Sequence, residues 1–164
     1  MEDRAIYQTK WSRKPKAKVI EFFVAGTPAT AGSKTPFIYK SKVNGKQRVA
    51  MCPANKKQKP WMAQVRAVAV EHYSGEPITK AIDLYCRFFL PRPKSHYGSG
   101  KNSGMVKDSA PEEPTGKPDL FKLVRAVEDA LTSIIWRDDS QIITVNASKR
   151  YHDKPGVEIR IEEK

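Results

Sequence analysis

AIDLYCRFFL, residues 81–90, alternates apolar and polar side chains along most of its length. Successive residues of a β-strand point to opposite faces of a sheet, so this pattern predicts a strand with one buried face. The apolar face holds Ile82, Leu84, Cys86, Phe88 and Leu90, and the polar face holds Asp83, Tyr85 and Arg87. Cys86 is therefore expected to be buried. Cys52 is the other cysteine of the chain, and the pair makes neither a disulfide framework nor a zinc pattern.

Two amphipathic helices are expected on either side of this strand in the sequence. Apolar side chains recur at helical spacing from Trp61 to Tyr73 and again over residues 118–131. Residues 91–117 between the strand and the second helix are rich in Pro, Gly, Ser and Lys. A loop of this length in a small domain is more often functional than idle. The apolar run from Ile134 to Trp136 is expected to form a short strand, with Trp61 and Trp136 in the core.

The remaining strands complete an α+β domain. Residues 19–25 form a first strand that ends at Gly26, and residues 37–39 and 47–51 flank an Asn44-Gly45 hairpin turn. Residues 143–147 and 157–161 form a terminal hairpin. The order β-β-β-α-β-loop-α-β-β predicts one mixed or antiparallel sheet with two helices. Residues 1–18 are expected to be a flexible basic arm, and residues 19–164 a single domain that includes loop 91–117.

The charge of the chain indicates a polyanionic partner. The formal charge is +12, and residues 1–60 carry 14 Lys/Arg residues against three acidic ones, a balance of +11. Neutralising phosphates releases counterions, so nucleic acid is the favoured partner, and a merely solubilising surface is the alternative. The sequence has no long apolar span and no nucleotide-binding glycine loop. Residues 1–18 are polar and basic with no apolar core, so we expect no signal peptide. We therefore expect a cytoplasmic, nucleoid-associated protein with no membrane contact and no nucleotide cofactor.

An acidic segment stands out in this basic chain. KPDLFKLVRAVEDALTSIIWRDDSQI, residues 117–142, contains Asp119, Glu128, Asp129, Asp138 and Asp139. Carboxylates repel phosphates unless a divalent metal bridges them, and Mg²⁺ prefers hard carboxylate oxygens with water. The alternative is structural: a helix cap, solvated side chains and a turn. Composition by itself favours that alternative, because acidic clusters in loops are common.

The same segment resembles the RusA family of Holliday junction resolvases. The resemblance rests on Lys117-Pro118-Asp119, Leu123, Arg125, Asp129-Ala130-Leu131, Trp136 and residues 138–142. The Gly-Thr-Pro loop at residues 26–28, the loop at 92–97 and the terminal hairpin are similar to this family too. The resemblance covers residues 19–162 loosely and residues 117–142 tightly.

This resemblance implies a small nuclease domain that works as a homodimer. Such an enzyme cuts four-way DNA junctions by paired symmetric nicks in recombination and repair, using Mg²⁺ with Mn²⁺ as a substitute. By position, Asp119 and Asp139 match the acids of the family's metal site, with Asp138 beside them. Arg125 matches a basic catalytic residue on the helix that faces the site. We expect Lys34, Lys94, Lys101, Lys117 and Lys122 to contact DNA.

The chain departs from the family pattern at Phe121. The family has its second acid there, which Phe cannot replace as a ligand, and Lys122 stands where Asn is usual. Glu128 returns to within about 20° of the same helical face but lies roughly 10 Å along the axis, so it cannot simply refill the missing position. It is a candidate ligand of the same ion from the other side only if Asp139 lies between the two helix levels. Asp129 competes with it, but lies four residues after Arg125 and is expected to pair with that residue.

Two other functions remain open at this point. A non-catalytic branched-DNA-binding protein, with its active site lost at Phe121, has the same charge pattern as the nuclease. An RNA- or ribosome-associated basic domain has no use for the acidic segment, so that segment argues against it. Only a cleavage assay separates the nuclease from the first alternative.

Overall fold

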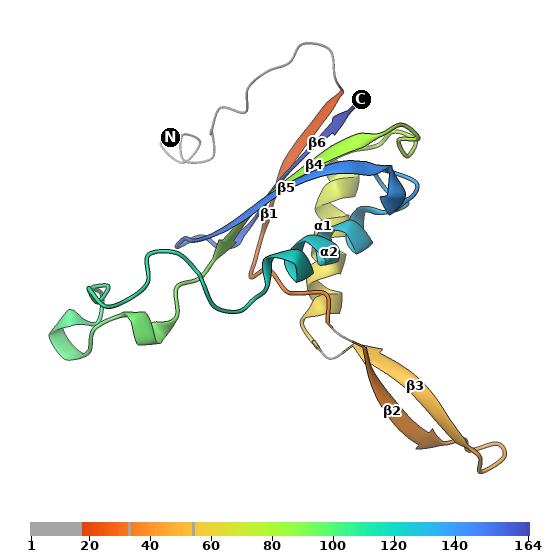
Figure 1. The fold of residues 1–164 in the computed structure, drawn as a ribbon, viewed down its shortest axis with the longest axis horizontal. Helices are drawn as coiled ribbons and strands as arrows, with labels where there is room; N and C mark the ends of the chain where they lie inside the picture. The colour runs from red at the N-terminus through yellow and green to blue at the C-terminus, as the bar shows by residue number, and fades with distance from the viewer. Residues whose placement is uncertain (1–17, 33, 54) are drawn as a thin grey trace.

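A four-stranded sheet with the strand order β1-β6-β4-β5 forms the centre of the molecule, and two helices cover one of its faces (Figure 1). Its strands are β1 (Val19–Ala25), β4 (Ile82–Leu90), β5 (Ile142–Tyr151) and β6 (Gly156–Glu163). β6 runs antiparallel to both β1 and β4, whereas β4 and β5 are parallel. The terminal hairpin predicted for residues 143–147 and 157–161 is therefore wrong, because β4 lies between β5 and β6 and pairs with both. This computed structural model describes residues 18–32, 34–53 and 55–164. The predicted α+β fold with two helices and a mixed sheet is confirmed.

A separate two-stranded ribbon extends away from this sheet (Figure 1). β2 (Lys34–Lys40) pairs with β3 (Gln47–Pro53) in antiparallel register, and neither strand pairs with the larger sheet. The sequence predicted a single sheet, and this prediction was wrong because β2 and β3 form a second sheet of their own. The Asn44-Gly45 turn lies between these two strands, and Gly45 adopts a positive φ of 65° that glycine accepts without strain.

The two helices form because each carries an apolar stripe that packs on the sheet. α1 (Gln58–His72) buries Trp61, Val65 and Ala69, which are spaced four residues apart. α2 (Leu120–Leu131) has a wider stripe, and its buried residues are Leu123, Val124, Ala126, Val127, Ala130 and Leu131. Trp61 and Trp136 lie in the core, as expected. Cys86 is also buried, and burial raises the pKa of its thiol.

Loop 91–117 is more ordered than its composition indicates. It contains two 3₁₀ turns, Lys94–His96 and Gly100–Asn102. Arg92 donates hydrogen bonds to the main-chain oxygens of Pro111 and Glu112, at 2.8 and 3.3 Å. Lys107 Nζ donates to the Ser95 oxygen at 2.9 Å. These contacts tie distant parts of the loop together, so it protrudes from the sheet as a folded segment on the other side from β2 and β3 (Figure 1).

Two further predictions from the sequence concern residues 1–18 and residues 134–136. The basic arm, residues 1–18, lies outside the described residues except for Lys18. The short strand expected at Ile134–Trp136 is a turn instead. Its amides bond back to the end of α2, with the Ile134 and Ile135 N–H groups both donating to the Leu131 oxygen at 3.0 Å. In the described part of the chain, no helix has the length and hydrophobicity needed to span a membrane.

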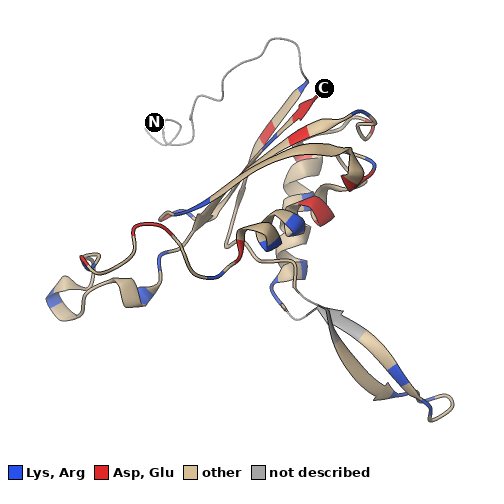
Figure 2. Cartoon of the chain, in the orientation of Figure 1, with Lys and Arg blue, Asp and Glu red and all other residues tan. Residues whose placement is uncertain are grey.

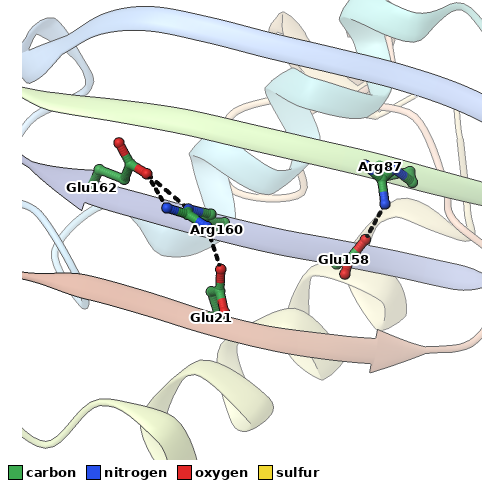
Figure 3. A network of polar contacts seen from close by, with 5 residues as sticks. All are labelled: Glu21, Arg87, Glu158, Arg160 and Glu162. Atoms are coloured by element: carbon green, nitrogen blue, oxygen red, sulfur yellow. Dashed lines mark hydrogen bonds and ion pairs between the residues drawn. The ribbon is translucent and has the colours of Figure 1, made fainter. Parts of the chain in front are cut away.

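The sheet face opposite the helices is a layer of ion pairs (Figure 3). Arg160 lies between Glu21, at 2.9 Å, and Glu162, and Arg87 pairs with Glu158 at 2.9 Å. The buried Asp83 pairs with Lys164 at one end of the same face. Four carboxylates thus lie against three cations, because Glu21 and Glu162 share Arg160. These ion pairs link neighbouring strands and leave a surplus of one negative charge among the groups named.

Candidate active site

The N-terminal end of α2 carries Asp119 in an ion pair. Asp119 occupies the position before the first helical residue, but its side chain makes no capping hydrogen bond. Instead Lys122 Nζ lies 2.9 Å from its carboxylate, and both side chains are about half exposed. The hydrogen bond from Lys122 lowers the pKa of Asp119, with further help from Lys117 and Lys149. Asp119 is therefore ionised and locally neutralised by cations.

Lys149 fixes the chain where it enters α2, a role the sequence did not indicate. It lies on β5, and its Nζ donates to the main-chain oxygens of Gly116 and Pro118 at 2.7 and 2.9 Å. These bonds hold the segment that carries Asp119 against the sheet. The only signal in the sequence is a lysine on an otherwise apolar strand face, which is not specific enough to identify this contact.

Phe121 lies on the outer surface of α2 and is 85 % exposed. It lies between Asp119 and Lys122 in the sequence. Exposure of a large aromatic side chain here means that it contributes little to the core. The position that the family resemblance assigns to an acid is thus a solvent-facing aromatic.

The C-terminal half of α2 carries a second acidic group, Glu128. This side chain is half-buried, and burial is the main cause of its raised pKa. The negative charges of Asp139 and Asp129 raise the pKa further, while Arg125 lowers it. Asp139 begins the short 3₁₀ turn Asp139–Gln141 that leads into β5. The fold therefore places Glu128 and Asp139 close enough to repel each other, although they are eleven residues apart in sequence.

A capped turn holds Asp139 in place. The Asp138 carboxylate accepts a hydrogen bond from the Ser140 amide at 2.9 Å. Hydrogen bonding to the Ser140 side chain, and then to its amide, lowers the pKa of Asp138. The Gln141 side-chain oxygen accepts from the Arg137 and Asp138 amides, each at 2.9 Å. Its amide nitrogen donates to the main-chain oxygens of Ile78 and Lys80 at 2.8 Å. Asp138, a candidate metal ligand in the sequence, thus serves as the helix cap of this turn.

Trp136 connects this turn to α2. Its ring is fully buried, and its Nε1 donates to Thr132 Oγ1 at 3.2 Å. Thr132 Oγ1 in turn donates to the Glu128 main-chain oxygen at 2.9 Å. The expected ion pair between Arg125 and Asp129 is not formed among the described residues, and Arg66 instead donates to the Asp129 main-chain oxygen at 3.1 Å.

The acidic residues lie in two places rather than one. Asp119 and Glu128 are nine residues apart on α2, which corresponds to roughly 13 Å along the axis. Figure 2 shows acidic segments near both ends of this helix, with basic residues between them. Among the described residues, no group of three or more His, Cys, Asp or Glu side chains is arranged to hold a metal ion. The fold brings Glu128 to Asp139 and leaves Asp119 at the other end of the helix.

The basic residues expected to contact DNA are spread over exposed segments. Lys94 and Lys101 are exposed on the 3₁₀ turns of loop 91–117, and Lys117 is exposed just before α2. Lys122 is engaged with Asp119. Lys34 begins β2, and its side chain lies outside the described part of the structure.

Comparison with known proteins agrees with the resemblance noted in the sequence. Residues 36–162 match the family described as Endodeoxyribonuclease RusA, which is well over half of the chain. The chain is also similar to a protein of Bacillus subtilis (strain 168) that bears the name Uncharacterized protein YqaN. The two are 34% identical over 147 residues, covering 88% of this chain and 96% of the relative. The matched region includes α2, Glu128 and Asp139, so the chain belongs to the RusA family of endodeoxyribonucleases.

Proposed function

We infer that this protein is a divalent-metal-dependent endonuclease that resolves four-way DNA junctions by paired nicks. The family match over residues 36–162 supports this most strongly. The repulsion between Glu128 and Asp139 supports the same conclusion, because two nearby carboxylates attract a divalent cation. Because the proposed substrate is DNA, we expect the protein to act at the nucleoid.

The donor set fits Mg²⁺, with Mn²⁺ as a substitute. Mg²⁺ is typically bound by one or two carboxylates, together with water and substrate phosphates. We propose that Glu128 and Asp139 hold the ion, which when bound lowers the pKa of water and offsets charge on the leaving oxygen. A metal at this pair also relieves the repulsion that raises the pKa of Glu128.

The basic residues of α2 have a positioning role in this proposal. Arg125 is exposed one turn before Glu128, where its guanidinium can bind a phosphate in two hydrogen bonds. Lys117 and Lys122 extend the positive surface to the start of the helix, and Lys94 and Lys101 extend it along loop 91–117. Asp119 belongs to the proposed catalytic set by resemblance. Because Lys122 neutralises it, we assign the metal to the other pair and test Asp119 separately.

The proposal is tested by incubating the purified protein with a mobile four-way junction and Mg²⁺. We expect nicks at symmetric positions in two opposing strands, and no nicks when EDTA removes the metal. A linear duplex of the same sequence is the matched control and should be cut far more slowly. Tight junction binding without nicks under any divalent metal would support the second candidate function, a non-catalytic branched-DNA-binding protein, which the exposed Phe121 favours.

Paired cuts require two sites, so we propose a homodimer. A four-way junction has near-twofold symmetry, and closed twofold pairing is the commonest oligomeric arrangement. Light scattering should give twice the chain mass of 18.5 kDa for the free protein, and two chains in addition to the DNA mass for the complex with a junction. A single-chain mass in both conditions would contradict paired cleavage by two copies.

A further inference from the structure

The ribbon formed by β2 and β3 has two uncovered faces. Phe37, Ile38 and Val49 are 59 %, 62 % and 64 % exposed, and no helix or other strand packs extensively against them. A two-stranded hairpin standing alone is marginally stable in water, so its exposed apolar side chains are better explained by a binding partner than by folding. The ribbon therefore offers an interaction surface that the rest of the chain does not occupy.

The positive charge of the ribbon indicates what kind of partner it binds. Residues 36–50 contain Lys40, Lys42, Lys46 and Arg48 and no acidic residue. All four cations are exposed, and none forms an ion pair with another described residue. Two ribbons from two copies of the chain would repel each other. The ion-pair layer on the open sheet face has four carboxylates against three cations, and its surplus of one negative charge does not match the four cations of a ribbon. A polyanion fits the ribbon better than a second copy does.

The strand register separates two kinds of side chain. Tyr39 lies opposite Arg48, and Phe37 is on the same face, whereas Ile38 lies opposite Val49 on the other face. In the major groove of a duplex, arginine can hydrogen-bond base edges, and apolar or aromatic side chains can contact the thymine methyl group. The major groove of duplex DNA is wide enough to admit a two-stranded ribbon. The surface thus combines phosphate-binding cations at its tip with a base-contacting face behind them.

We propose that the ribbon is a DNA-binding arm that enters the groove of a duplex arm of the junction, away from the nicking site. Lys42 and Lys46, on either side of the turn, contact phosphates, and the Phe37–Tyr39–Arg48 face contacts the bases. This inference rests on the proposed function, since it takes DNA as the substrate. It adds residues that the family resemblance did not assign.

The first test measures the salt dependence of junction binding by the full chain. Lys42→Gln/Lys46→Gln is compared with Lys80→Gln/Lys154→Gln, which removes two exposed lysines from outside the ribbon and α2. Removing the charges of Lys42 and Lys46 should eliminate two phosphate contacts. The slope of log affinity against log salt should then fall in magnitude by about 1.8, since each contact contributes roughly 0.9. The control pair should leave the slope unchanged.

The second test uses Phe37→Ser/Tyr39→Ser. Loss of base-edge contacts should weaken junction binding about tenfold or more at every salt concentration without changing the slope. Circular dichroism checks that each variant keeps the fold, and sedimentation velocity gives its oligomeric state. The two variants remove different contacts, those to phosphates and those to bases, so the arm is overturned only if neither variant has its expected effect.

The outcomes separate failure of this inference from failure of the proposed function. Wild-type protein that binds neither junction nor duplex DNA at low salt overturns both. Wild-type binding that both ribbon variants retain in full overturns the arm and leaves the nuclease proposal standing. Dissociation of a dimer by Phe37→Ser/Tyr39→Ser, with DNA affinity per dimer unchanged, assigns the ribbon to self-association and overturns the arm as well.

Discussion

Asp139→Asn is expected to lower the rate of junction nicking by about a hundredfold to a thousandfold, the range typical of losing one charged group that stabilises a transition state. The substitution keeps the shape of the side chain and removes the charge that faces Glu128. Junction affinity should stay unchanged or become slightly tighter, because one fewer negative charge faces the phosphates. Single-turnover cleavage and fluorescence anisotropy on the same junction measure the two effects separately.

Three further variants locate the catalytic pair. Glu128→Gln should resemble Asp139→Asn if the two carboxylates act together. Asp129→Asn is the matched control, because Asp129 is exposed and contacts Arg66 through its main chain. Asp138→Asn should be mild, since an amide oxygen can still accept the Ser140 hydrogen bond. If Asp119→Asn abolishes nicking and Asp139→Asn does not, the catalytic group lies at the other end of α2.

Trp136→Ala is expected to reduce the free energy of unfolding by about 3–5 kcal/mol, as large-to-small substitutions of buried aromatics do. The ring is fully buried and holds the turn that leads to Asp139 through its bond to Thr132. For a domain of this size the melting temperature should fall by roughly 10 °C. Urea denaturation followed by fluorescence of the remaining tryptophans gives the free energy.

Two comparison variants test whether the stability lost in Trp136→Ala comes from the packing of its ring. Phe121→Ala removes an aromatic ring that is 85 % exposed and should change stability by less than about 0.5 kcal/mol. Trp136→Phe keeps most of the buried ring and loses the hydrogen bond to Thr132. Its loss of unfolding free energy should therefore lie between those of Trp136→Ala and Phe121→Ala. Equal urea midpoints for Trp136→Ala and Phe121→Ala would contradict the assigned role of Trp136.

The local pattern of the sequence determined which segments form helices and strands and which faces they bury. Residues 82–90 alternate, and Leu123 and Val127 recur at helical spacing, because one buried face is a property of the segment itself. The acidic segment and its family resemblance also located α2 and Asp139 as the region of interest. These inferences needed only neighbours in sequence.

Contacts between distant segments decided the rest. The turn at residues 134–136 carries the apolar residues of a strand, but its amides bond to the end of α2. The approach of Glu128 to Asp139, and the anchoring of residues 116–118 by Lys149, depend on how β5 lies along α2. The detachment of β2 and β3 from the main sheet depends on which strands find partners. Sequence periodicity fixes the face a residue occupies, whereas the identity of the group across from that face depends on chain topology, which only the tertiary structure provides.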